Sequence, residues 1–102
     1  PGQGKVHYSP GIPIRLNALI PNIDEAFILI KKRKYTGKNF YYLTKNRNLK
    51  EAAKNLYRTM RTIKNKNFKK IAVEKIPNKG FGLAINDRLN RASKKWQSKL
   101  KI

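Results

Sequence analysis

The sequence predicts a small Rossmann-like α/β domain of layered architecture, with about four strands in the order β-β-β-α-β-α, preceded by an extended linker. Three observations carry this prediction. Three short segments of β-favouring residues come first, an amphipathic helical segment follows, and a further strand and helix close the chain. The length of 102 residues fits one domain, and a hydrophobic content of 39% suffices for one modest core.

Residues 1–13 are predicted to form the interdomain linker, because Pro10, Gly11 and Pro13 prevent a helix. We assign residues 14–98 to the accessory α/β domain and residues 99–102 to a basic tail. The chain starts with Pro-Gly-Gln-Gly rather than Met, which indicates either a piece of a longer protein or the remnant of a tag.

The first three strands are predicted in the first half of the domain. Residues 14–18 alternate between apolar and polar, which is typical of a half-buried strand. Residues 26–30 form a continuous apolar run, which predicts a strand covered on both faces, and residues 39–43 have high β propensity. The connecting loops are too short for helical crossovers, so antiparallel pairing or skipped neighbours must occur among these strands.

A helix is predicted to start after Asn48, because Asn48 and Glu51 have the spacing of a capping box in which each side chain binds a free backbone N–H. A fourth strand is expected at residues 71–73. The last helix starts near Gly80. The apolar stripe of the first helix is Leu49, Ala52, Ala53, Leu56, Met60 and Ile63, and that of the last is Phe81, Ile85, Leu89, Ala92 and Trp96.

The chain is strongly basic, with 25 Lys and Arg against 5 Asp and Glu and a net charge of +20. Such a charge attracts polyanions and predicts salt-dependent contact with RNA. A coding bias towards A and T would raise Lys, Asn and Ile together and explains the same composition without a ligand. If RNA is bound, the candidate contacts are the basic loop residues Lys31, Lys32, Arg33 and Lys34.

Catalysis is not expected from this chain. Cysteine is absent, His7 is the only histidine, and the five carboxylates are scattered over different elements, so no catalytic residue and no metal site can be assembled from their spacing. No apolar run approaches the roughly 20 residues that a membrane span needs. A chain without cysteine is compatible with a reducing compartment, and we expect the cytoplasm.

Two features of the last helix could bind a phosphate. Gly80 and Gly82 at its start could offer backbone N–H groups, or they could simply form a tight turn from strand to helix. Arg88 and Arg91 could hold a phosphate or an interdomain carboxylate. The alternatives are a solvated helix flank for Arg88 and a local pair with Asp87 for Arg91.

The ordered set of motifs resembles the C-terminal domain, with its linker, of the long-form threonylcarbamoyl-AMP synthases, whose catalytic domain is YrdC-type. The linker has Pro1-Gly2, His7-Tyr8 and Pro10 at the spacing P-G-x-x-x-x-H-Y-x-P. The helix at residues 49–61 is similar to E-A-A-x-N-L-[FY]-x-x-[LM]-R. Residues 80–92 are similar to the closing G-[LF]-G-x-A-I-x-[ND]-R-L-x-R-A signature.

This sequence departs from the family pattern at two places. Val6 stands where the family usually has a polar residue, and the basic loop at residues 31–34 replaces a more neutral one. The first departure puts linker contacts near Val6 in doubt.

The resemblance implies a role in tRNA modification. The parent enzyme of such a domain is a nucleotidyltransferase that condenses threonine, bicarbonate and ATP into threonylcarbamoyl-AMP with release of pyrophosphate, the intermediate for t6A in tRNA. ATP and Mg belong to the parent enzyme, and no cofactor is expected in this chain. The implied partner is the YrdC-type catalytic domain of the same chain.

Three functions follow as expectations. In the first, the domain is a clamp whose linker residues His7 and Tyr8 contact the catalytic pocket. In the second, it is a basic module that recruits tRNA or a partner of the modification machinery. A free-standing nucleotide-binding fold is the third.

Overall fold

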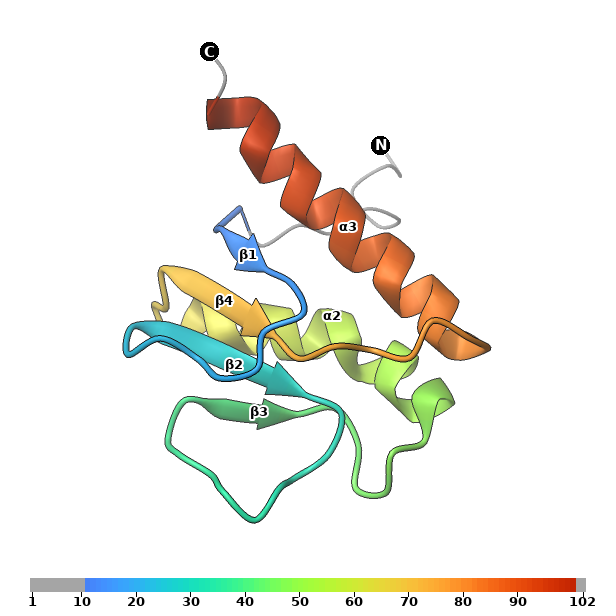
Figure 1. The fold of residues 1–102 in the computed structure, drawn as a ribbon. Helices are drawn as coiled ribbons and strands as arrows, with labels where there is room; N and C mark the ends of the chain where they lie inside the picture. The colour runs from blue at the N-terminus through green and yellow to red at the C-terminus, as the bar shows by residue number, and fades with distance from the viewer. Residues whose placement is uncertain (1–10, 101–102) are drawn as a thin grey trace.

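The computed structural model describes residues 11–100, with side chains for residues 11–93. A four-stranded parallel sheet and two helices make up this part of the chain (Figure 1). The predicted order β-β-β-α-β-α is confirmed. In chain order the elements are β1 (Ile14–Arg15), β2 (Glu25–Leu29), β3 (Phe40–Tyr42), α2 (Leu49–Asn65), β4 (Lys70–Val73) and α3 (Phe81–Leu100).

The strands lie in the order β1-β4-β2-β3, and every neighbouring pair is parallel. β1 and β2 are therefore skipped neighbours with β4 between them, as predicted. β2 and β3 depart from the expected rule, since they are parallel neighbours joined by a loop over residues 30–39 without a helix. The loop can lead back to the start of a parallel strand without a helix, because β3 is only three residues long and a chain covers about 3.3 Å per residue.

Both helices pack on one face of the sheet, and their buried side chains share one core with alternate residues of the strands. No helix of the described chain covers the opposite face. Residues 16–24 cross in front of that face between β1 and β2 (Figure 1). They cover a smaller cluster formed by Ala18, Phe27, Leu29 and Ala72. β2 is buried along its whole length, which confirms the strand predicted to be covered on both faces.

The start of α2 follows the prediction in one half of the capping box. Asn48 Oδ1 accepts hydrogen bonds from the backbone N–H of Lys50 and Glu51, at 2.9 and 3.1 Å. The reciprocal bond was predicted wrongly. The N–H of Asn48 donates to Asn46 instead, and Glu51 accepts from the N–H of Lys45 at 3.4 Å, because the preceding loop folds back over the first turn.

The two glycines before and within α3 have different explanations, backbone conformation for Gly80 and close packing for Gly82. Gly80 has φ of +56°, the left-handed region that glycine enters without steric cost. A Cβ on Gly82 would overlap the carbonyl oxygen of Pro77, so the helix passes too close to the preceding turn for any side chain. The large apolar side chains of the α3 core stripe start at Ile85, whereas Phe81, predicted in that stripe, is 51% exposed, because it is Gly82 that faces Pro77 and Leu49 in the first turn. The Trp96 side chain lies outside the described residues.

Replacing Gly82 with alanine should destabilise the domain by about 1–3 kcal/mol, because the added methyl group forces the helix away from Pro77. Urea denaturation of the 102-residue chain measures this change. Gly37→Ala is the control, since its Cβ meets only side-chain atoms of Asn39 and Phe40, the nearest at 3.2 Å. Equal stability of the two variants would contradict the turn interpretation.

Candidate functional site at the helix-free face

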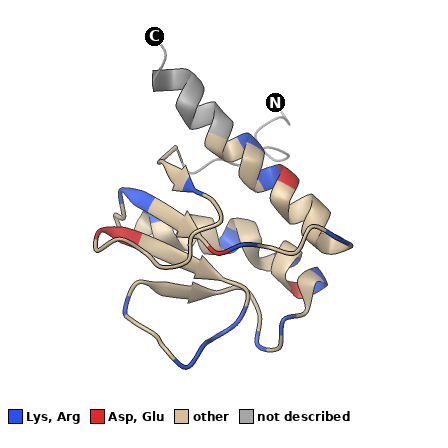
Figure 2. Ribbon diagram, viewed as in Figure 1, with Lys and Arg blue, Asp and Glu red and all other residues tan. Residues whose placement is uncertain are grey.

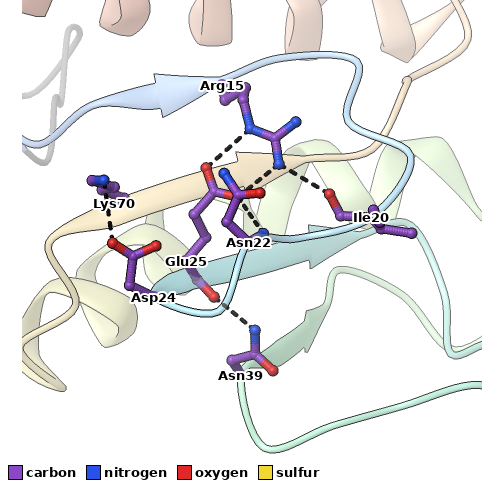
Figure 3. Close-up of polar contacts among 7 residues, drawn as sticks. All are labelled: Arg15, Ile20, Asn22, Asp24, Glu25, Asn39 and Lys70. Atoms are coloured by element: carbon purple, nitrogen blue, oxygen red, sulfur yellow. Dashed lines mark hydrogen bonds and ion pairs between the residues drawn. The ribbon is translucent and has the colours of Figure 1, made fainter.

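An ion pair joins the first two strands across the face that carries no helix (Figure 3). Arg15 donates to Glu25 through both Nε and Nη2, at 3.0 and 2.7 Å. The alternation of side chains along each strand places both residues on this face, since Ile14 and Ala26 point to the helices. The Glu25 side chain is only 4% exposed, whereas that of Arg15 is 44% exposed. The pair is thus a buried carboxylate held by a guanidinium that reaches solvent.

The same carboxylate organises the loop between the two strands. The backbone N–H of Asn22 donates to Glu25 Oε1 at 2.7 Å, and Arg15 Nη2 also donates to the carbonyl oxygen of Ile20 at 2.9 Å. Asn39 donates to the carbonyl oxygen of Glu25 and joins the start of β3 to this network. The loop is therefore held by hydrogen bonds at Ile20 and at Asn22 (Figure 3).

Electrostatics keep this pair charged. The hydrogen bond from Arg15 holds the pKa of the Glu25 carboxyl below its ordinary value, with a further contribution from the N–H of Asn22, and these outweigh burial, which acts in the opposite direction. The same bond raises the pKa of Arg15 above its ordinary value. The carboxylate is consequently ionised at neutral pH.

The ion pair between Arg15 and Glu25, which we call the anchor, lies where residues 11–13 run into β1. The carbonyl oxygen of Pro13 accepts from the N–H of Ile71 at 2.9 Å, so sheet bonding begins before β1. Ala18 donates its N–H to Val73 at 2.9 Å, and Ile12 packs against the main core. Because β1 has only two residues, these contacts and the ion pair together hold the incoming chain against β4.

Four large apolar side chains are exposed beside this anchor. The exposed fractions are 84% for Leu19, 72% for Ile20, 102% for Ile23 and 83% for Tyr35. Leu19, Ile20 and Tyr35 line a groove of about 340 Å³ whose floor includes Phe27. We call this surface, formed by Leu19, Ile20 and Tyr35, the apolar patch. Contiguous apolar surface of this kind is typical of an interaction site.

The two predicted arginines of α3 lie elsewhere, on the helical side of the domain. The Arg88 guanidinium lies 5.3 Å from the ring centroid of Tyr57 on α2, a cation–π contact between the two helices. Arg91 pairs with Asp87 at 3.2 Å along the same helix. A phosphate or interdomain contact of Arg88 and Arg91 stays a prediction.

The four cations of the basic loop at residues 31–34 do not share one environment. Lys31, Lys32 and Lys34 are exposed. Arg33 turns towards the sheet, where it pairs with Glu74 at 2.6 Å and lies 5.7 Å from the ring centroid of Phe27.

His7 and Tyr8 fall outside the described residues, so their contact with a catalytic pocket stays a prediction. Among the residues that are described, no three His, Asp or Glu gather as a metal site would require. Within the same part of the chain, neither helix combines the length and the apolar character of a membrane span.

Comparison with known families decides the assignment. Residues 1–94 match the family described as "Threonylcarbamoyl-AMP synthase, C-terminal domain". The chain belongs to this family. Comparisons with curated proteins and with solved structures found no match. Membership connects this threonylcarbamoyl-AMP synthase C-terminal domain to the synthesis of t6A, as the motif resemblance predicted.

Sequence reasoning missed the anchor and the apolar patch. Arg15 was assigned only to a strand and Glu25 was counted among scattered carboxylates, although a Glu directly before a fully apolar run in an acid-poor chain signals a buried partner. Leu19, Ile20 and Ile23 surround a Pro-Asn turn, where apolar side chains have no core to enter. Apolar residues beside a turn were therefore the sequence feature that could have predicted an exposed apolar surface here.

Glu25→Gln should destabilise the domain by about 2 kcal/mol at neutral pH, because it removes the charged partner of Arg15. Since the folded-state pKa of Glu25 is lowered, its contribution is complete above the unfolded value of about 4.3 and is lost as pH falls through the folded-state value. Denaturation of both proteins at a series of pH values measures the difference.

The matched control is Asp24→Asn, because the Asp24 carboxylate pairs with Lys70 at 3.2 Å with both side chains about half exposed. It should change stability by less than about 1 kcal/mol. A Glu25→Gln effect that is no larger, or that does not shrink in acid, would show that the pair does not hold the anchor.

Proposed function

We propose that the chain is the clamp domain of a threonylcarbamoyl-AMP synthase, which positions the linker over the catalytic pocket of a YrdC-type domain in the same chain. The observation that supports this proposal is that residues 11–13, the end of the predicted linker, meet the anchor and the apolar patch at one place. These residues run into β1, Arg15 and Glu25 fix them there, and the next residues expose Leu19 and Ile20.

The apolar patch is the surface proposed to dock on the catalytic domain. Its side chains have little protein contact of their own, and covering them would bury apolar surface that is otherwise in water. The anchor is held by several hydrogen bonds, so docking of the patch would also fix the direction in which the linker leaves the domain. A clamp needs both a surface that docks on the catalytic domain and a linker with a fixed direction.

The proposed benefit of the clamp is exclusion of water. Threonylcarbamoyl-AMP is a mixed anhydride, so an open pocket would lose it to hydrolysis. A linker held across the pocket, with His7 and Tyr8 as its contacts, would protect the intermediate until transfer. ATP and Mg would bind the catalytic domain, and this domain would act only through position.

The test is made in the full-length enzyme with Leu19→Ser/Ile20→Ser. We expect the yield of threonylcarbamoyl-AMP per ATP consumed to fall between about tenfold and a hundredfold, with more free AMP, because a misplaced linker admits water. Chromatography of the products formed from threonine, bicarbonate and ATP measures the ratio. Deletion of residues 1–102 should have an effect at least as large.

Leu83→Ser is the control, because Leu83 is also an exposed apolar residue but lies on α3, away from the patch. It should leave the product ratio unchanged. The clamp proposal fails if the truncated enzyme keeps its full rate and yield, or if Leu83→Ser and the patch variant behave alike.

A further inference from the structure

A second surface, independent of the anchor and the apolar patch, lies at the carboxyl edge of the sheet. Two adjoining hollows of about 540 and 480 Å³ share Glu51, Asn55 and Arg58 of α2 as common lining. We call the combined surface the basic groove. Its cations are Lys32 after β2, Lys45 after β3, and Lys50, Lys54 and Arg58 on α2.

The cations on α2 repeat at every turn. Lys50, Lys54 and Arg58 are four residues apart, so they form a row of about 12 Å along one side of the helix. Like charges at this spacing repel each other and destabilise a helix. On α3 the same spacing joins Asp87 to Arg91 with opposite charges. The repulsion along α2 would be relieved by an anion that follows the row.

Acidic residues do not neutralise this groove. Glu51 is its one carboxylate among the described lining residues, and it accepts from the backbone N–H of Lys45. The other four acidic residues pair with Lys or Arg at other places in the fold. Figure 2 shows the result, with Lys and Arg along the loop after β3 and the first turns of α2.

Hydrogen bonds fix the floor of the groove. Asn55 donates to the carbonyl oxygen of Leu43 at 2.9 Å, and its own side-chain oxygen accepts from Arg58 at 2.7 Å. Thr44 donates to the carbonyl oxygen of Ile30 and accepts from the N–H of Arg47, which holds the loop after β3. The cations are thus carried on a backbone that is ordered before any ligand binds.

The residues that line the groove favour RNA over an acidic protein segment as the bound polyanion. Protein partners usually need apolar or aromatic anchors at the centre of the interface. None of the large apolar side chains that are exposed in the described chain lines this groove. It offers instead cations and the amide of Asn48, which suit phosphates and sugar hydroxyls. An RNA backbone satisfies this surface without an apolar anchor.

We propose that the basic groove binds the phosphate backbone of RNA. Lys45, Lys50 and Lys54 contact successive phosphates, and Lys32 flanks them from the loop after β2. The contact is electrostatic and independent of base sequence, because the groove places cations rather than a pattern of base-reading groups. This proposal differs from the expectation that residues 31–34 bind RNA. Arg33 pairs with Glu74, and only Lys32 of these four residues lines the groove.

The test compares two variants of the 102-residue chain that lose the same charge. The groove variant is Lys45→Gln/Lys50→Gln/Lys54→Gln. The control is Lys64→Gln/Lys66→Gln/Lys69→Gln, three exposed lysines at the opposite end of α2 and before β4. Fluorescence anisotropy with labelled transfer RNA is recorded at several salt concentrations, and circular dichroism checks that both variants keep the fold.

The groove variant should bind about tenfold or more weakly near physiological salt, and the slope of log affinity against log salt should fall by about 2, for three lost phosphate contacts. The control should change both quantities far less. Equal losses in the two variants would overturn the proposal, because they would mean diffuse attraction by the net charge.

Two further outcomes would also overturn it. One is the absence of RNA binding by the unmodified chain at about 150 mM salt, which would mean that the positive charge reflects a bias in composition. The other is equal affinity for a poly-glutamate peptide of the same charge, which would assign the groove to acidic protein segments. Preference for RNA over that peptide is the result expected.

Discussion

The bonds between Arg15 and Glu25 decide how the helix-free side of the sheet is covered. A two-residue β1 at a sheet edge has few bonds of its own, and the loop after it packs only Ala18 deeply. The carboxylate of Glu25 collects the guanidinium and the loop backbone at one point, and breaking one partner of a buried pair leaves an uncompensated charge. Both the path of the chain into β1 and the position of the apolar patch depend on this contact.

Local patterns in the sequence were sufficient to predict the helices and strands. They predicted less of how these elements are arranged. Periodicity identified both helices, a continuous apolar run identified the buried strand predicted at residues 26–30, and Asn48 marked the start of α2. The parallel pairing of β2 and β3 was not foreseen, because it depends on how short β3 is. Phe81 was misplaced in the core, since a helical stripe does not show where the helix leaves the sheet.

Candidate binding residues were harder to predict, because they depend on which side chains share a surface. The basic run at residues 31–34 is conspicuous in the sequence, yet the fold turns Arg33 towards Glu74. Lys45, Lys50 and Lys54 are unremarkable in sequence and come together only when α2 packs beside the end of β3. The structure thus separates an apolar surface beside the linker from a basic one at the carboxyl edge.

Hydrogen–deuterium exchange tests the clamp most directly, because it reports on the loop between β1 and β2 without a mutation. Exchange of residues 16–24 is compared between the full-length enzyme and the 102-residue chain, with the Lys66–Lys69 segment as an internal reference. Docking of the apolar patch predicts slower exchange of residues 16–24 in the full-length enzyme and an unchanged reference. Identical exchange in the two proteins would contradict the account.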